Sequence, residues 1–154
     1  MKEHIRNSVK AVVIRAGEIL LLQKEDGLGA YTVLPGGGQR MGEALPEALR
    51  RECMEEINAP VSVGELLFVR DYISDHHEFA ASSGYVHQVE FLFACTLAED
   101  YQPCSGPEPD RGQQQVLWVP LEALEQANFY PRALVPHLLK LSAPDRPVYL
   151  GDVN

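Results

Sequence analysis

The sequence predicts a mixed α/β (α+β) fold in which β-strands pack against a small number of helices. Short apolar runs bounded by Gly, Pro and polar residues recur along the chain, and each has the length of a strand. One segment, residues 43–57, instead shows the 3.6-residue apolar period of a longer helix. The 154 residues, 45% of them hydrophobic, suffice for one domain with a buried core. We therefore expect a single domain over residues 1–154.

The first third of the chain predicts a β-hairpin and then a strand that leads into a glycine-rich turn. Apolar runs on either side of Ala16 and Gly17 are typical of two strands joined by a tight turn. A third run must end at Pro35, and the three glycines after it favour a flexible turn. The expected elements are strands over residues 8–15, 18–25 and 31–35, a loop over 26–30 and the turn 36–38.

The rest of the chain predicts further strands, two polar loops and short helical segments. Residues 61–74 are long enough for one strand or a strand pair bent at Gly64. Residues 85–97 become continuously apolar, as in a central strand buried on both faces. Also expected are loops over 75–84 and 98–114, a strand over 115–120, a helical turn over 121–126 and an amphipathic helix over 131–141. The loop 98–114 is long and rich in Pro and Gly, and such loops are often functional.

Charge and composition argue against several classes of protein. Thirteen basic and 22 acidic side chains give a formal charge of −9, which disfavours broad contact with a nucleic-acid backbone. There is no run of about 18 apolar residues to span a bilayer, and the first residues lack the apolar stretch of a signal peptide. Cys53, Cys95 and Cys104 form no C-x-x-C pair and indicate neither a disulfide framework nor a zinc site. We expect a cytoplasmic protein without a membrane or nucleic-acid partner.

Three glutamates crowd one face of the helix predicted over residues 43–57. The apolar stripe of this helix consists of four residues spaced by four: Leu45, Leu49, Cys53 and Ile57. Glu52, Glu55 and Glu56 stand beside it at positions i, i+3 and i+4. Acids near a helix C-terminus oppose the macrodipole and repel each other, at a cost of a few tenths to about 1 kcal/mol each. The cluster is either a solvated acidic face or a site for a hard cation such as Mg²⁺, which binds carboxylates, waters and phosphate oxygens.

The residues around this cluster resemble the Nudix box, the signature of hydrolases that act on a nucleoside diphosphate linked to another moiety. The family pattern is G-x5-E-x7-R-E-U-x-E-E-x-G-U, where U is a bulky apolar residue. Seven positions match in register: Gly37, Glu43, Arg51, Glu52, Cys53, Glu55 and Glu56. Leu34, Pro35 and Gly36 match the usual lead-in. Two positions depart, because Asn58 replaces the second glycine and Ala59 replaces a larger aliphatic residue. Asn tolerates the left-handed conformation that a helix cap needs, so the departure should not move the carboxylates.

The resemblance covers essentially the whole chain and implies a Nudix-like α/β/α sandwich, with a mixed β-sheet between helices. It also implies that the protein binds Mg²⁺ or Mn²⁺. Glu52 and Glu56 would be the principal ligands, and Glu55 would assist directly or through water. A carbonyl oxygen of Gly36 or Gly37 would be an additional ligand.

Glu43 and Arg51 resemble the structural ion pair of the family, which holds the start of the helix against the preceding loop. Eight residues are about two helical turns, so Arg51 must reach back along the axis to meet Glu43. Two independent surface charges would also fit the sequence.

The general base and the substrate contacts stay open at this stage. Glu90 is a lone acid in an apolar strand, so it is either a catalytic base or the partner of Arg15 or Arg70. His76 and His77 are adjacent and therefore favour a solvated loop over a metal site. The candidates for the base outside the box are Glu78, Glu90, Glu99, Asp100, Glu108 and Asp110. The candidates for contact with the substrate are Arg70, Tyr72, Glu90 and Phe129, followed by Tyr31, Tyr85, His87 and Tyr130.

The resemblance implies a Mg²⁺- or Mn²⁺-dependent pyrophosphohydrolase that cleaves the phosphoanhydride of a nucleoside diphosphate linked to another moiety. A nucleotide sugar such as ADP-ribose, a dinucleoside polyphosphate and a (d)NTP all fit, and the partner would be this small nucleotide. A nucleotide-binding module that has lost catalysis is the alternative, although it would be expected to lack a box carboxylate. An isoprenoid isomerase would need a cysteine before the box, whereas the first cysteine is Cys53. Many relatives are dimers, so a homodimer is also considered.

Overall fold

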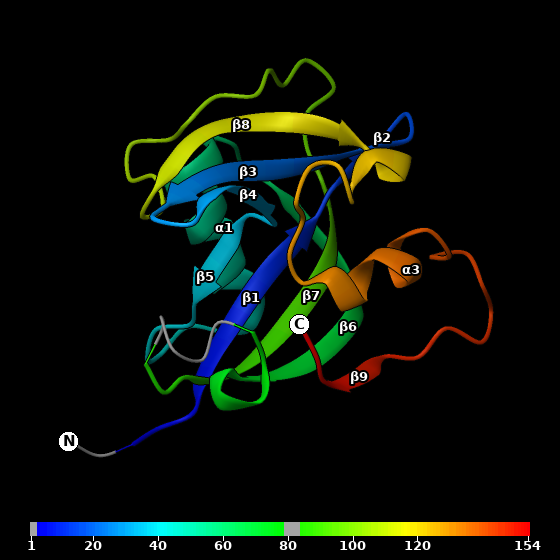
Figure 1. Cartoon of the computed structure of the whole chain (residues 1–154). Coiled ribbons are helices and arrows are strands. Elements are labelled where there is room, and N and C mark those ends of the chain that lie inside the picture. Colours follow the sequence, from blue (N-terminus) through cyan, green and yellow to red (C-terminus); the bar gives the residue numbers. More distant parts are fainter. Residues whose placement is uncertain (1–2, 79–83) are drawn as a thin grey trace.

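The computed structural model describes residues 3–78 and 84–154, and the strands within them form two sheets (Figure 1). The strands are β1 (Arg6–Val12), β2 (Ile14–Arg15), β3 (Glu18–Asp26), β4 (Gly29–Val33), β5 (Gly36–Gly38), β6 (Ser62–Ile73), β7 (His87–Thr96), β8 (Gln113–Pro120) and β9 (Tyr149–Asp152). The larger sheet has the order β5-β1-β7-β6-β9, and β3 pairs with β2, β4 and β8 in the smaller one. The pairs β1–β7 and β6–β9 are parallel and the other pairs are antiparallel, so the larger sheet is mixed as expected.

The helical elements cover both faces of the strands. They are α1 (Leu45–Ile57), α3 (Val135–Leu138) and the 3₁₀ turns η1 (Ser74–His76), η2 (Leu121–Ala123) and η3 (Arg132–Leu134). Figure 1 shows α1 behind the strands and α3 in front of them. None of the helices in the described residues is long and apolar enough to cross a membrane.

Strand β3 shows why the core has two halves. Successive side chains of a strand point to opposite faces. Leu20 and Leu22 therefore pack with α1, while Ile19 and Leu21 pack with η3 and α3. All four are completely buried, so the apolar run that predicted this strand serves both layers. The α/β/α arrangement expected from the sequence is confirmed.

The single strand expected over residues 8–15 is instead divided between the two sheets. β1 pairs with β5 and β7, and only Ile14 and Arg15 form the predicted hairpin with β3. Val12 is buried in the core half beside α3 and Val13 in the half beside α1. The chain crosses from one sheet to the other at this point, which a continuous apolar run does not reveal.

The three glycines expected as a flexible turn form the edge strand β5. Gly36 lies opposite Lys10 of β1, and Gly38 lies opposite Ser8. A Cβ atom on Gly36 would lie 2.0 Å from the carbonyl oxygen of Val9, and its φ is +138°. Glycine is required here because two backbones approach closely, so the prediction of a turn was wrong.

The last part of the chain differs most from the prediction. The amphipathic helix expected over residues 131–141 consists of η3 and the single turn of α3. β9 was not predicted at all, and it pairs in parallel with β6 through Val69 and Asp71. The four residues of β9 follow a polar connection and are too few to show the alternation of apolar and polar residues that predicts a strand. The loop expected over 75–84 is described only in part, because residues 79–83 lie outside the described residues.

The loop between β7 and β8 closes the C-terminal end of α1. Gly106 N donates to the carbonyl of Glu56 at 3.0 Å, and Glu108 N donates to that of Glu55 at 2.9 Å. The Tyr101 hydroxyl donates to the carbonyl of Ile57 at 2.8 Å. These contacts satisfy carbonyl groups that a helix end leaves without partners, and they fix the loop beside the glutamates.

Asn58 ends α1 in the left-handed conformation, with φ 55° and ψ 41°. We expect Asn58→Ala to lower the free energy of unfolding by about 1 kcal/mol. The left-handed conformation brings the Cβ atom close to the following carbonyl oxygen, and alanine has no polar side chain that could offset this strain with a local hydrogen bond. Asn58→Gly should stay within about 0.5 kcal/mol of the wild type. Urea unfolding of the three proteins checks this, and an Asn58→Ala variant as stable as the wild type would contradict it.

Candidate active site

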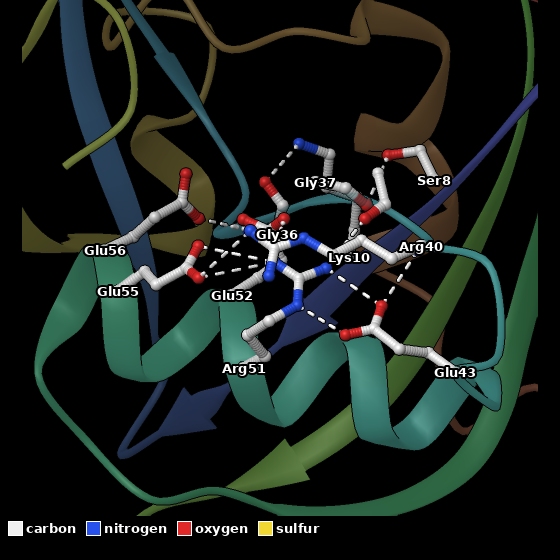
Figure 2. Close-up of polar contacts among 11 residues, drawn as sticks. Ser8, Lys10, Gly36, Gly37, Arg40, Glu43, Arg51, Glu52, Glu55 and Glu56 are labelled. Atoms are coloured by element: carbon white, nitrogen blue, oxygen red, sulfur yellow. Dashed lines mark hydrogen bonds and ion pairs between the residues drawn. The ribbon is translucent and has the colours of Figure 1, made fainter. Parts of the chain in front are cut away.

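The acidic face of α1 is turned toward the glycines of β5. The Glu56 side chain is only 2% exposed, and Gly36 N donates to its Oε1 at 2.7 Å. The carboxylate of Glu52 lies against Gly37, where an added Cβ would be 2.7 Å from it. Figure 2 shows these carboxylates with Glu55 on the same side of the helix. The glycines thus leave the space that the carboxylates occupy.

Burial of Glu56 makes its charge unfavourable. Loss of solvation raises the pKa of Glu56 to about 8, and the nearby charges of Asp110 and Glu52 add to this effect. The charge of Lys10 and the N–H group of Gly36 oppose it but do not compensate. A buried carboxylate of this kind favours a proton or a cation as its partner.

Arg51 lies between the other acids of the helix (Figure 2). Its guanidinium contacts Glu43 at 2.5 and 3.0 Å, which is the ion pair that the sequence predicts. It also donates to Glu52 at 2.9 Å, to Glu55 at 3.3 Å and to the Gly38 carbonyl at 2.9 Å. The hydrogen bonds from Arg51 and from the Arg40 N–H group lower the pKa of Glu43 to about 2. One guanidinium therefore sets the positions of three carboxylates and of β5.

Two side chains of β1 contact the glycine strand, and the sequence reasoning missed both. Ser8 Oγ donates to the Gly37 carbonyl and Lys10 Nζ donates to the Gly36 carbonyl, each at 3.2 Å. These are the two carbonyl oxygens expected as additional metal ligands. The polar residues at alternate positions of an otherwise apolar strand were the signal that could have revealed them.

The loop between β7 and β8 brings one candidate base to the cluster and leaves others outside. Asp110 lies near Glu56 and pairs with Lys24 at 2.8 Å. Partial burial raises the pKa of Asp110, but Lys24 outweighs it, so the pKa lies below its ordinary value. The other candidate bases from the loops, Glu78, Glu99, Asp100 and Glu108, are exposed.

Glu90 and Arg70 form a buried ion pair across β7 and β6. Arg70 contacts both Glu90 oxygens at 3.3 Å, and Gln88 Nε2 donates to Glu90 at 2.9 Å. Burial raises the pKa of Glu90, but the charges of Arg70 and Lys10 outweigh it, so the pKa lies below its ordinary value. Arg15, the other candidate partner, instead donates to the carbonyls of residues 97–99. Arg70 is thus engaged with Glu90 inside the protein, and it also lines a small cavity together with Lys10.

The aromatic candidates separate into core and cavity residues. Phe129 is 1% exposed and packs in the core beside α3, so its side chain does not face a ligand. Tyr31, Tyr72 and Tyr130 line a cavity of about 820 Å³, together with Asn128. His87 instead contacts Asp71 at 2.9 Å, and Tyr85 is exposed at the surface.

A smaller cavity of about 100 Å³ borders this space. It shares Val33 and Tyr130 with the large cavity, and Lys10 and Glu90 also line it. Lys10 contacts Gly36, which in turn binds Glu56. The aromatic cavity is therefore linked to the carboxylates through Lys10 and Gly36.

The chemistry of the acidic cluster fits a divalent cation whose coordination shell is completed by waters and by substrate phosphates. Within residues 3–78 and 84–154, no group of three or more His, Cys, Asp or Glu side chains could hold a metal ion as placed. Mg²⁺ is usually held by one or two carboxylates together with waters and substrate phosphates, so it needs no complete protein cage. Glu52, Glu55 and Glu56 supply hard oxygen donors, and the space at Gly37 admits the Glu52 carboxylate.

Comparison of the sequence with models of protein families shows to which family the chain belongs. The family model of the NUDIX domain matches residues 4–138. The chain belongs to the Nudix family. This membership confirms the expectation of a Nudix-type pyrophosphohydrolase, and Nudix hydrolases generally use divalent metal ions. No curated protein matches the chain.

Solved structures of the same fold include several Nudix proteins. A NUDIX hydrolase from Nitrosomonas europaea is similar with a TM-score of 0.70 and 18% identity, over 96% of this chain and 94% of its own. A MutT NUDIX hydrolase from Burkholderia pseudomallei has a TM-score of 0.60 and 28% identity, over 78% and 86%. An ADP-ribose pyrophosphatase from Streptococcus suis has a TM-score of 0.64 and 16% identity, over 98% and 100%.

Gly37 and Gly38 offer a matched pair of substitutions. We expect Gly37→Ala to weaken Mg²⁺ binding about tenfold, because the added Cβ displaces the Glu52 carboxylate. Gly38→Ala meets only the flexible guanidinium of Arg6, at 2.7 Å, and should bind Mg²⁺ as the wild type does. Calorimetric titration measures both affinities. Equal affinities in the two variants would show that the position of Glu52 does not matter for the ion.

The raised pKa of Glu56 predicts an unusual dependence of stability on pH. The folded protein binds this proton more tightly than the unfolded chain, whose carboxyl has the ordinary pKa of 4.5. The metal-free protein should therefore lose stability as pH rises from about 4.5 to about 8, by on the order of 2–4 kcal/mol. Glu56→Gln should remove this loss, and Mg²⁺ should raise the Tm of the wild type more than that of the variant. Thermal unfolding with and without EDTA tests this, and identical pH profiles would contradict it.

Proposed function

We propose that the protein hydrolyses the phosphoanhydride of a nucleoside diphosphate linked to another moiety, with Mg²⁺ or Mn²⁺ at the carboxylates of α1. The observation that carries this proposal is the continuity between the two parts of the site. The aromatic cavity and the acidic cluster are joined through Lys10 and Gly36. A nucleotide bound in the cavity would extend its phosphates past Lys10 toward Glu52 and Glu56.

The aromatic cavity has the size and the chemistry for a nucleoside. Its volume of about 820 Å³ is in the range of small-molecule sites. Tyr31 and Tyr130 meet edge to face, with centroids 6.4 Å apart, and Tyr72 lines the same space. Aromatic faces stack on any base, and the amides of Asn128 and Asn154 provide polar contacts. ADP-ribose or another nucleotide sugar, a dinucleoside polyphosphate and a (d)NTP all remain candidate substrates.

Each side chain of the acidic cluster would have its own role in the proposed reaction. Glu52, Glu56 and Glu55 would hold a divalent cation, which supplies positive charge to the diphosphate and promotes ionisation of water. Arg51 keeps Glu52 and Glu55 oriented, and Glu43 keeps Arg51 in place. Glu56, or Asp110 near it, would accept the proton of the attacking water. Lys10 would contact the phosphates between the cavity and the cluster.

The S. suis neighbour is described as an ADP-ribose pyrophosphatase, but a likeness at 16% identity shows the fold alone. An activity assay with each substrate class is therefore needed to distinguish between them. A cytoplasmic location, a homodimer and a single domain over residues 1–154 stay predictions.

A panel assay with carboxylate variants tests the proposed function. The wild type should hydrolyse at least one of the three substrate classes in a reaction that requires Mg²⁺ or Mn²⁺. Glu52→Gln and Glu56→Gln should each lower kcat/KM by about 100-fold or more, because each removes an anionic ligand. Glu122→Gln, an exposed acid on η2, should retain wild-type activity. Full turnover by Glu56→Gln would refute its assignment, and binding of nucleotide without any hydrolysis would favour a binding module.

A further inference from the structure

A segment outside the family match forms part of the aromatic cavity. The NUDIX match ends at residue 138, whereas Asn154 lines the cavity beside Tyr72. Residues 149–154 comprise β9 and the two residues after it, and we refer to them as the β9 segment. In Figure 1 β9 lies beside β6. This segment therefore lies beyond the residues that the family model matches, and it reaches the proposed nucleotide site.

The β9 segment is held in place by two histidines. His76 Nδ1 contacts Asp152 Oδ2 at 2.6 Å, and His77 Nε2 contacts Asp152 Oδ1 at 2.7 Å. Ile73 N donates to the same carboxylate at 3.1 Å. The contacts of the two histidines lower the pKa of Asp152 to about 2, although its loss of solvation alone would raise it. The adjacent histidines that looked like a solvated loop thus clamp one aspartate from both sides.

The buried Arg70–Glu90 pair holds the other end of the segment. Arg70 Nη1 donates to the Val153 carbonyl at 2.6 Å, and the Val153 N–H donates to the Asp71 carbonyl at 3.2 Å. Glu90 occupies the remaining side of the same guanidinium. A charged pair that does not contact the carboxylate cluster is therefore used to position this backbone.

One of the two histidines that hold Asp152 contacts a residue that lines the aromatic cavity. The His77 ring stacks on Tyr72, with centroids 5.5 Å apart and an interplanar angle of 13°. Arg70 also lies over the Tyr72 ring, with its guanidinium carbon 5.4 Å from the ring centroid. Tyr72 is thus oriented by the same two side chains that anchor the β9 segment. Loosening the segment should therefore affect both Asn154 and an aromatic wall of the cavity.

The Asn154 amide keeps hydrogen-bonding capacity for a ligand. Its Oδ1 accepts from Arg70 at 3.5 Å, and its Nδ2 donates to Glu78 at 3.3 Å. An amide group has two N–H donors and two acceptor lone pairs. One donor and one acceptor of this amide therefore remain, and an amide with both can discriminate between nucleobase edges.

We propose that the β9 segment is a specificity element: Asn154 contacts the base of the bound nucleotide, and Asp152 and Arg70 are positioning residues that hold it there. The proposal rests on the proposed function, because the ligand is taken to be a nucleotide. It adds that selection among bases depends on a segment that follows the residues matched by the family model. The cation and the carboxylates of α1 play no part in this selection.

The test compares Asn154→Ala, Asp152→Ala and a control, Asp145→Ala, which removes an exposed acid from the connection before β9. Steady-state kinetics with nucleotides that differ only in the base give KM, kcat and the spread of kcat/KM among adenine, guanine, cytosine and uracil. In the first two variants we expect KM for the preferred base to rise about tenfold, with kcat within about twofold and a smaller spread. The control and the Mg²⁺ activation curves should match the wild type.

Calorimetric binding of nucleoside monophosphates separates this proposal from the proposed function. Hydrolysis with unchanged KM and unchanged base preference in both variants would overturn the proposal and leave the proposed function intact, even if the Tm of Asp152→Ala falls. If the wild type binds monophosphates but hydrolyses no nucleotide, the proposed function fails, and the variants' affinities still decide this proposal. A wild type that binds no monophosphate would overturn it.

Discussion

The hydrogen bond from Gly36 N to the buried Glu56 carboxylate, at 2.7 Å, joins the glycine strand to the acidic helix. It depends on the missing side chain of Gly36, because a Cβ there would overlap the Val9 carbonyl and push β5 away from β1. With β5 in place, Gly37 can accept the Glu52 carboxylate, and Arg51 can reach the Gly38 carbonyl. The approach of two backbones therefore sets the geometry of the carboxylates.

The unfavourable charge on this face is balanced by residues from distant parts of the chain. Arg51 is shared among Glu43, Glu52 and Glu55, and Lys10 approaches Glu56 from β1. The loop between β7 and β8 satisfies the carbonyls at the end of α1 and carries Asp110 with it. The raised pKa of Glu56 shows that this balance is incomplete in the protein alone, which is consistent with a site that a cation completes.

The aromatic cavity is built differently from the acidic cluster. The glutamates of the acidic cluster all come from one helix. The aromatic cavity is instead lined by residues of separate elements, among them Tyr31, Tyr72, Tyr130 and Asn154. Its wall is anchored by the Arg70–Glu90 pair and by the Asp152 clamp. The aromatic cavity and the acidic cluster share no lining side chain among the described residues, so substitutions can alter one without altering the other.

The sequence by itself determined the mixed fold class, the helix that ends at Asn58 and the grouping of three glutamates, since these depend on local periods and fixed spacings. The Glu43–Arg51 pair followed from the family resemblance, and the structure confirms it. Only the tertiary structure decided that Gly36–Gly38 form an edge strand, that Phe129 belongs to the core and that Arg70 pairs with Glu90. It also decided the place of β9 and the contact of Lys10 with Gly36. These features join residues far apart in the chain, and their free energy comes from burial and from charge pairing, which no local pattern records.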